Sequence, residues 1–149
     1  MTPEEWIRKI AQQQERIRHT VSRVLPVKVG VLAEGQFKDN FLKGGFVNNG
    51  LQKWKPAKRQ LSGKKDTKTK NKTLVASGLL YKSIGHVTGA ARVVVQNKVP
   101  YAAVHNEGLR AGRGRGFQMP RRQFIGDSRE LNEKVEKTID TELRKIIEN

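Results

Sequence analysis

A histidine, an asparagine and a glutamate stand together at His105-Asn106-Glu107, and their side chains are the first candidates for chemistry. A nuclease or a metal site uses a histidine and a carboxylate in this way. Residues two apart on a helix point to different faces, however, and no second histidine-rich cluster supplies the missing ligands. The other two histidines, His19 and His86, stand alone. We therefore interpret His105 as a structural histidine beside Tyr101, and we expect no metal ion and no catalytic residue.

A glycine- and arginine-rich run, Gly112-Arg113-Gly114-Arg115-Gly116, is the second candidate because such runs can cradle phosphates. It lacks the Gly-Lys-Ser/Thr ending of a P-loop, and it lacks the strand, fingerprint and helix order of a dinucleotide site. We expect no nucleotide and no other cofactor. The run lies in a predicted basic loop at 109–118. Two interpretations stay open for this loop: a flexible element that approaches phosphates, or a solvated surface loop.

A lysine-rich arm is the third candidate. Between Lys53 and Lys72 there are nine Lys or Arg residues and one acid, Asp66, which gives a net charge of +8. Such a segment buries too little apolar surface to offset the entropy of ordering it, so we predict a mobile basic loop over 53–73. Lysines on such a loop contact polyanions without reading sequence. DNA contact and a merely solvated loop remain equally open. Taken together, the two basic segments offer as DNA-facing candidates Lys55, Lys58, Arg59, Lys64, Lys65, Lys68, Lys70, Arg113 and Arg115.

Enzymatic chemistry finds no further support in the sequence. The carboxylates Glu130, Glu133, Glu136 and Asp140 lie on the polar face of a predicted helix, where solvated charge is the ordinary role. The chain has no cysteine, which excludes a disulfide framework, a thiolate nucleophile and a cysteine-based zinc site. We expect a protein that is not an enzyme.

The net charge of the whole chain is +16, from 30 Lys plus Arg against 14 Asp plus Glu in 149 residues. Of this excess, +8 lies in residues 53–72 and +5 in residues 110–122, which leaves +3 for the rest. A length of 149 residues predicts a single domain, 1–149. No stretch approaches the length of an apolar membrane span, and two acids precede the first apolar run, so we expect no membrane association and no secretory signal.

A helix is predicted at the N-terminus. Thr2 can cap it, Pro3 suits its first position, and apolar residues recur at near-helical spacing to about Leu25. Pro26 is expected to interrupt this helix. The following stretch, 27–42, combines alternating valines with helical spacing of its later residues. The pattern favours helix and leaves a strand open.

The middle of the chain predicts short elements. Residues 74–81 indicate a helical or turn segment, and two β-rich runs, 83–88 and 92–97, indicate a hairpin with Val93-Val94-Val95 as a well-buried strand. Residues 101–108 indicate one helical turn closed by a glycine, and residues 119–126 are extended in character.

A second long helix is predicted at the C-terminal end. Its apolar stripe repeats at intervals of four and three residues from Leu131 to Ile146. Asp127, with Glu130 three residues later, resembles a capping box. The fold class is therefore α+β: N- and C-terminal helices packed on a small antiparallel sheet, with a long basic loop.

The order of short motifs carries a resemblance. It runs Phe41-x-x-Gly44-Gly45-Phe46, Trp54-x-Pro56, a variable basic loop, Leu74-Val75-x-Ser77-Gly78-x-Leu80-x-x-Ser83-Ile84, a valine-rich strand, Val99-Pro100-Tyr101-Ala102-x-Val104-His105-x-x-Gly108 and Met119-Pro120-x-Arg122-x-Phe124-Ile125-Gly126. From about Phe37 to the C-terminus this order resembles the phage virion morphogenesis family, which includes the tail-completion proteins of Mu-like and P2-like phages. The family is distantly similar to the head–tail joining proteins of long-tailed phages.

The resemblance implies a structural, non-enzymatic subunit that forms a ring at the head-proximal end of the tail. The implied partners are copies of itself, other tail and neck or connector proteins, and passing double-stranded DNA. The implied location is the virion, with the host cytoplasm during assembly. Helices packed on a small sheet in similar proteins favour helix for 27–42. Gln123 stands where the family usually has a proline.

The matched residues also read as determinants of the fold. We expect turns at Gly44, Gly78, Gly108 and Gly126, and core anchors at Trp54, Tyr101 and Phe124; His105 and Pro120 complete the pattern. Two other functions stay open: a free, non-specific nucleic-acid-binding module and, in third place, a nuclease that uses His105 and Glu107.

Overall fold

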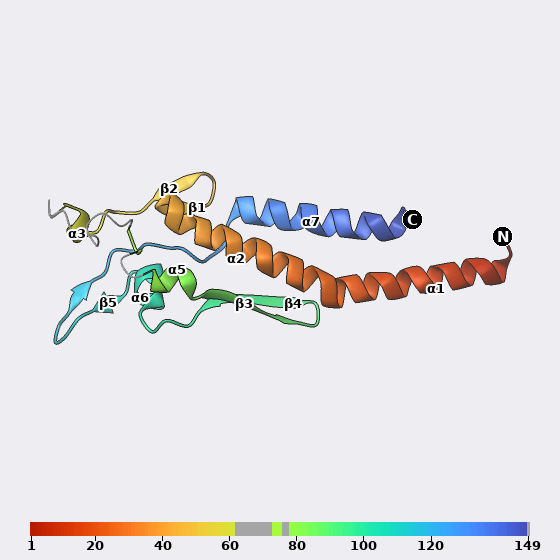
Figure 1. Ribbon diagram of the computed structural model, residues 1–149, viewed down its shortest axis with the longest axis horizontal. Helices are drawn as coiled ribbons and strands as arrows, with labels where there is room; N and C mark the ends of the chain where they lie inside the picture. Colours follow the sequence, from red (N-terminus) through yellow and green to blue (C-terminus); the bar gives the residue numbers. More distant parts are fainter. Residues whose placement is uncertain (62–72, 76–77, 149) are drawn as a thin grey trace.

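The computed structural model describes residues 1–61, 73–75 and 78–148, which form an elongated α+β molecule (Figure 1). A long helical run and a second long helix extend along its axis, and short elements gather at one end. The elements are α1 (Pro3–His19), a π-helical turn (Thr20–Val24), α2 (Leu25–Lys43), β1 (Gly45–Val47), β2 (Leu51–Lys53), α3 (Lys58–Leu61), α5 (Leu79–Lys82), β3 (Ile84–Gly89), β4 (Arg92–Asn97), α6 (Ala102–Glu107), β5 (Arg110–Ala111), β6 (Phe117–Gln118) and α7 (Arg129–Ile147).

The N-terminal helix begins as its sequence predicts. The Thr2 hydroxyl accepts a hydrogen bond from the Glu5 N–H, and the Glu5 carboxylate accepts one from the Thr2 N–H. This reciprocal pair satisfies two N–H groups that would otherwise lack a partner at the helix start. Pro3 occupies the first helical turn, where an N–H is not needed.

The helix does not stop at Pro26, so the predicted interruption is wrong. The chain continues from α1 into α2 through the π-helical turn, in which the Leu25 N–H bonds the Thr20 carbonyl five residues back. Pro26 has no N–H for the Ser22 carbonyl four residues before it. The Ala91 N–H, from the turn between β3 and β4, donates to that carbonyl over 3.2 Å. A distant part of the chain thus supplies the donor that proline lacks.

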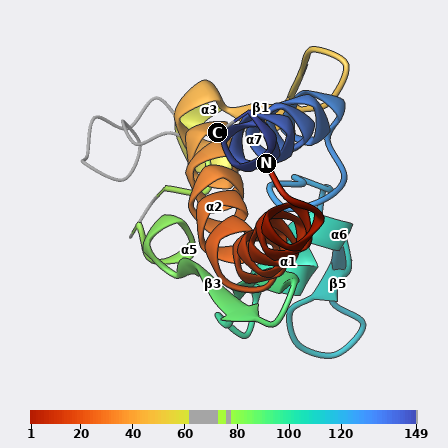
Figure 2. The same cartoon turned by 90° about the vertical axis from the view of Figure 1, so that its right-hand side faces the viewer.

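The favoured helix over 27–42 is confirmed by α2, which is the central support of the fold. It packs against α7 on one side and against β3 and β4 on the other, an arrangement seen along the long axis in Figure 2. Gly44 ends it in the left-handed conformation (φ 71°) that glycine adopts without strain.

The strands form antiparallel pairs: β1 with β2, β3 with β4, and β5 with β6. The hairpin predicted over 83–97 is confirmed, with Ile84 opposite Asn97 and Gly89 opposite Arg92. Its second strand is not well buried, however. Val94 is 39% exposed, and Val93 and Val95 are half-buried. A two-stranded hairpin covers α2 with one face only, so the other face stays open to solvent.

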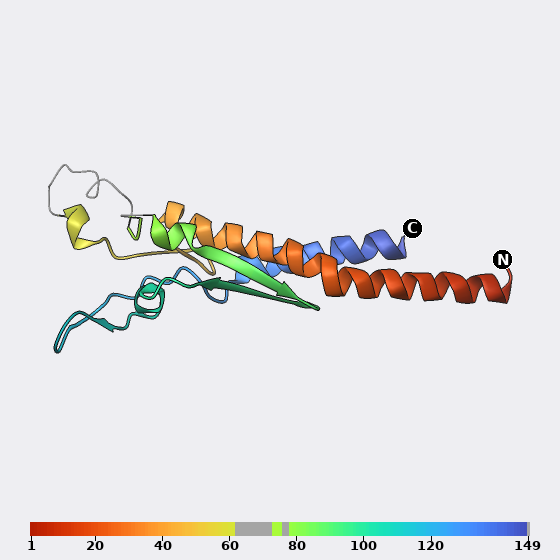
Figure 3. The same cartoon turned by 60° about the horizontal axis from the view of Figure 1, so that its bottom comes forward.

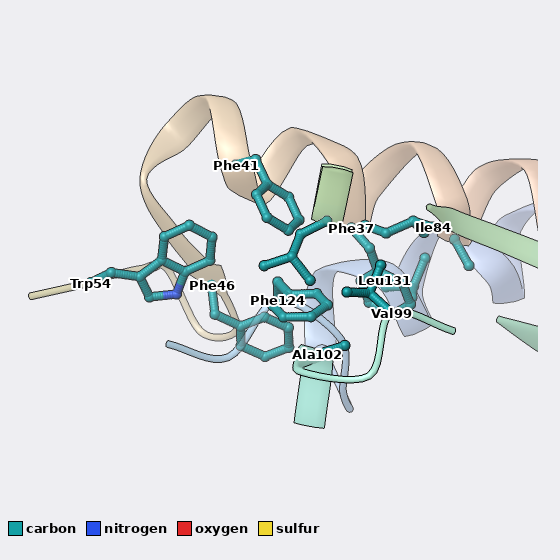
Figure 4. Close-up of a cluster of buried hydrophobic side chains, with 11 residues drawn as sticks. Phe37, Phe41, Phe46, Trp54, Ile84, Val99, Ala102, Phe124 and Leu131 are labelled. Carbon is teal, nitrogen blue, oxygen red and sulfur yellow. The ribbon is translucent and has the colours of Figure 1, made fainter. Parts of the chain in front are cut away.

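The core gathers where α2, the short elements and the start of α7 meet (Figure 4). Phe41 is fully buried at its centre. Its ring meets Trp54 edge-on at 5.5 Å between centroids and lies 5.1 Å from Phe124. The surrounding buried side chains are Ala33, Phe37, Phe46, Leu80, Ile84, Val99, Ala102 and Leu131. These residues come from elements spread along the chain between positions 33 and 131, so one core joins them.

The last helix is confirmed, but its cap is not Asp127. Ser128 caps α7: its hydroxyl accepts from the Leu131 N–H and donates to the Val47 carbonyl over 2.6 Å. The side chain is completely buried. Asp127 instead accepts a hydrogen bond from the Asn132 side chain. Serine takes the cap because its short side chain fits the interior while it also reaches β1.

No helix in the described part of the chain is both long and apolar enough to cross a bilayer.

Two glycines of α2 give a matched stability test. Gly30 is buried, and a methyl group there would overlap the His86 ring. A 2.5 Å hydrogen bond to Glu34 holds that ring in place. At Gly35, by contrast, nothing lies within 4 Å of an added methyl group. We expect Gly30→Ala to lower the free energy of unfolding by about 1–3 kcal/mol through overpacking. We expect Gly35→Ala to raise it by up to about 1 kcal/mol through helix propensity. Urea denaturation of both variants measures the difference, and equal shifts would contradict this packing.

Candidate functional site

The segment from Arg122 to Ile125, which belongs to no helix or strand, lies at the base of the candidate site, and side chains satisfy its backbone. The side-chain amide oxygen of Asn106, Oδ1, accepts from the backbone N–H groups of Phe124 and Ile125, at 2.9 and 3.0 Å. The Phe124 carbonyl accepts from the Asn40 amide, and the Gln123 carbonyl from the Trp54 indole. A buried backbone outside a sheet needs such partners. Asn106, taken above as part of a catalytic candidate, therefore has a structural role.

Arg122 joins this segment to the first basic segment. It is only 6% exposed, and its guanidinium donates to the backbone carbonyls of Lys55 (2.8 Å) and Pro56 (3.3 Å). The backbone N–H of Arg122 donates to the backbone carbonyl of His105 over 2.8 Å. Of the five arginines between 110 and 122, Arg122 is the buried one. We call it a strut because its guanidinium holds residues 55 and 56 against the segment 122–125.

His105 lies beside Arg122 on α6. Its ring meets the Tyr101 ring edge-on, with 6.0 Å between centroids, so the predicted packing of the two is confirmed. Its Nδ1 atom is buried and has no hydrogen-bond partner among the described residues. Burial, and then the charge of Arg122, hold the pKa of His105 below its usual value. The folded chain therefore favours the neutral imidazole over the charged one.

A groove of about 540 Å³ opens between residues 55–58 and 117–122. Apolar and basic side chains both line it. Its lining consists of Lys55, Pro56, Ala57, Lys58, His105, Phe117, Gln118, Met119, Pro120 and Arg122. Two basic segments that are far apart in sequence thus share one surface.

The second basic segment is a hairpin rather than a plain loop. Arg110 pairs with Gln118 and Ala111 with Phe117, so β5 and β6 hold the glycine-rich turn between them. Arg113 and Arg115 lie in that turn and are exposed. Three of its glycines, at 112, 114 and 116, have positive φ angles, which explains why glycine alternates with arginine here.

The described basic candidates lie at one end of the molecule. Lys55 is exposed after β2, while Lys58 and Arg59 belong to α3. In Figures 1 and 3, α3 and the β5–β6 hairpin both lie at the end opposite the two chain termini. Residues 53–61 and 108–126 contain no acid. The candidates Lys64, Lys65, Lys68 and Lys70, and most of the predicted 53–73 loop, lie outside the described residues.

The residues expected to fix the fold have different positions. Gly78 starts α5 and Gly108 ends α6, both with φ near 70°, and Gly126 lies in a bend. Trp54 is buried and Phe124 is 1% exposed. Tyr101, expected in the core, is 41% exposed; it immediately precedes α6, and its ring contacts that of His105.

Sequence reasoning missed the buried polar residues that hold the site together. Asn40 and Gln36 lie on the buried face of α2, where Gln36 donates to Ser128 over 3.0 Å. The sequence did contain a signal: the polar residues Gln36 and Asn40 directly precede the apolar residues Phe37 and Phe41, one helical turn apart. Polar groups on a core face are retained when they satisfy buried partners.

The chemistry of this end is electrostatic. In the described ranges, no three His, Cys, Asp or Glu side chains gather as a metal site would require. The groove offers cationic side chains and apolar surface.

A comparison with family models gives a match over residues 45–144, to the phage virion morphogenesis family. The match covers β1 to most of α7, including the groove and both described basic segments. Searches of curated proteins and of solved structures gave no match to this chain.

Arg122 and its neighbour Arg121 allow a test of the strut. We expect Arg122→Met to lower the free energy of unfolding by about 2–3 kcal/mol, because it removes two charged hydrogen bonds from a buried guanidinium to backbone carbonyls. Arg121 is exposed, and we expect Arg121→Met to change the free energy of unfolding by less than about 0.5 kcal/mol. Urea denaturation of each variant decides the matter, and equal effects would show that Arg122 is not a strut.

His105 predicts a pH dependence of stability. An unfolded chain protonates this histidine below about pH 6.5, whereas the folded chain holds it neutral to lower pH. The unfolded state then binds more protons, so folding stability falls as the pH drops below about 6.5. We expect His105→Gln to reduce this loss, as measured by thermal unfolding at a series of pH values. An unchanged pH dependence in the variant would contradict a partly buried imidazole that the fold keeps neutral.

Proposed function

Because the chain belongs to the phage virion morphogenesis family, we propose that this virion structural protein acts in tail completion or head–tail joining. In this proposal its subunits assemble as a ring at the head-proximal end of the tail. The basic end of each subunit faces the channel through which double-stranded DNA passes. Neighbouring tail, neck or connector proteins bind the outer faces of the ring.

The observation that carries the proposal is the position of the charge. The exposed cations Lys55, Lys58, Arg113 and Arg115 lie at the end of the molecule that contains no terminus. The helical body has little net charge; α7 carries five basic and five acidic residues. A molecule built in this way presents its positive potential in one direction, and a ring can turn that direction inward.

A ring also explains why modest, unspecific cations would suffice. Lysine and arginine contacts to phosphates read no sequence, which suits DNA that moves past. Each exposed cation is repeated once per subunit, so a few residues give a dense positive collar. Mobile counterions released from the DNA would make the contact sensitive to salt.

A charge reversal at the hairpin tip tests the DNA-facing role. We expect Arg113→Glu to leave the fold and the joining of heads to tails intact but to lower the yield of infectious phage at least about tenfold, because each ring then carries a circle of acids beside DNA. Electron microscopy of lysates and plaque counts, in a phage that depends on the variant, measure the two effects. Lys137→Glu, an exposed change on α7, is the matched control and should stay near wild type.

Contrary outcomes separate the alternatives. Infectivity equal to that of the control would remove the DNA-facing role. Joined, infectious particles in the complete absence of the protein would remove the joining function itself. A free nucleic-acid-binding module would instead bind duplex DNA tightly as a monomer, with log K falling by about 0.9 per phosphate contact as log salt rises. A gel-shift titration at two salt concentrations detects that behaviour.

A further inference from the structure

The groove between residues 55–58 and 117–122 combines two kinds of side chain. Its apolar lining consists of Pro56, Ala57, Phe117, Met119 and Pro120. Its cations include Lys55 and Lys58, which are exposed and form no ion pair within the described part of the chain. Because residues 53–61 and 108–126 contain no acid, neither segment brings a carboxylate to these lysines. The groove therefore presents apolar surface and uncompensated positive charge together.

Phe117 is the large apolar side chain that the groove leaves open to solvent, with 55% of it exposed. Its ring lies against Gly112, where an added methyl group would come within 3.1 Å of the ring. Gly112 also has a positive φ angle of 91°, so glycine suits this position for two reasons. An exposed aromatic ring with a fixed place beside other apolar groups is typical of a binding anchor.

Both sides of the groove are held by bonds within the chain. On one side, the Arg122 guanidinium binds the backbone carbonyls of residues 55 and 56. On the other side, the Met119 N–H donates to the Leu109 carbonyl over 3.0 Å and so continues the pairing of β5 with β6. The volume of about 540 Å³ lies within the ~300–1,000 Å³ of typical ligand clefts. A groove formed in advance spares its partner the cost of ordering it.

Double-stranded DNA matches only the charge of this groove. The outer surface of a duplex consists of sugars, phosphates and base edges, whereas the base faces are stacked inside it. Phosphates would pair with the lysines and leave Phe117 and Met119 without an apolar partner. A protein segment that carries carboxylates beside an aromatic or large aliphatic side chain matches both the charge and the apolar surface. The observations therefore favour a protein segment over DNA as the occupant.

We propose that the groove binds an acidic segment of another protein, whose apolar anchor packs on Phe117 while its carboxylates pair with Lys55 and Lys58. The inference goes beyond the proposed function, because it requires neither a ring nor DNA. It divides the basic end of the molecule, where α3 and the β5–β6 hairpin lie together (Figure 1), into two surfaces. Arg113 and Arg115 at the hairpin tip do not line the groove, so they stay available to phosphates.

Selection from a library of random peptides on the immobilised full chain is the first test. We expect the enriched sequences to combine Asp or Glu with an aromatic or large aliphatic residue, because the groove needs both. Enrichment of sequences that lack acids would overturn the proposal. Equal enrichment on a chain with Lys55→Glu and Lys58→Glu would overturn it as well.

Binding of one enriched peptide, labelled with fluorescein and followed by fluorescence anisotropy, is the second test. We expect Phe117→Ala and Lys58→Glu each to weaken the binding at least about tenfold, through loss of the anchor and reversal of a charge. Leu109→Ala, which changes an exposed apolar residue outside the groove, and Lys137→Glu on α7 are the matched controls. Circular dichroism checks that each variant is folded. Equal binding by the groove variants and their controls would overturn the proposal.

Competition with duplex DNA separates the two classes of occupant. We expect Phe117→Ala to leave any binding of DNA unchanged, since a phosphate contact does not use the ring. Duplex DNA that displaces the peptide and that itself requires Phe117 would make the groove a DNA site and overturn the proposal. Self-association that requires Phe117 and excludes the peptide would place a second copy there instead. Failure of the peptide test leaves the Arg113→Glu result intact, so the DNA-facing role is judged separately.

Discussion

The fold depends on keeping the backbone of residues 122–125 satisfied inside the molecule. This stretch places Phe124 at the centre of the core, yet it belongs to no helix or strand. Asn40, Asn106 and Trp54 supply the bonds that a strand neighbour would otherwise provide. Those three side chains come from α2, α6 and the residue after β2. One irregular segment therefore fixes the relative positions of three distant elements, and with them the groove.

The sequence was sufficient to predict the elements that are stabilised by contacts between residues close together in the chain. Thr2 and Glu5 cap a helix with residues three apart, the glycines 44 and 108 end helices, and the β3–β4 hairpin pairs neighbours in sequence. The same reasoning failed where a distant group decides. Pro26 ends no helix because Ala91 serves the carbonyl it leaves free, and Ser128 displaces Asp127 as a cap because Val47 offers it a bond.

The site was predictable in its composition and not in its assembly. The sequence places lysines and arginines in two segments, but only the fold brings residues 55–58 beside 117–122. Net charge also overstated what is available to a partner. Arg122 is buried because the carbonyls of Lys55 and Pro56 need a donor, so its charge holds the groove in shape. A count of charges does not distinguish a buried arginine that holds the fold together from an exposed arginine that can contact a partner, whereas the burial of the side chain does.

The family match and the folding unit do not coincide, and the difference is informative. The match begins at residue 45, whereas Phe37 and Phe41, which fill the core, belong to α2 before it. Residues 45–144 therefore need α2 to complete their interior, since deleting two buried phenylalanines would leave a large cavity. α1 does not complete the core in this way, because none of its residues is buried. The core therefore depends on α2 and not on α1, whose apolar residues Trp6 and Ile10 remain about half exposed.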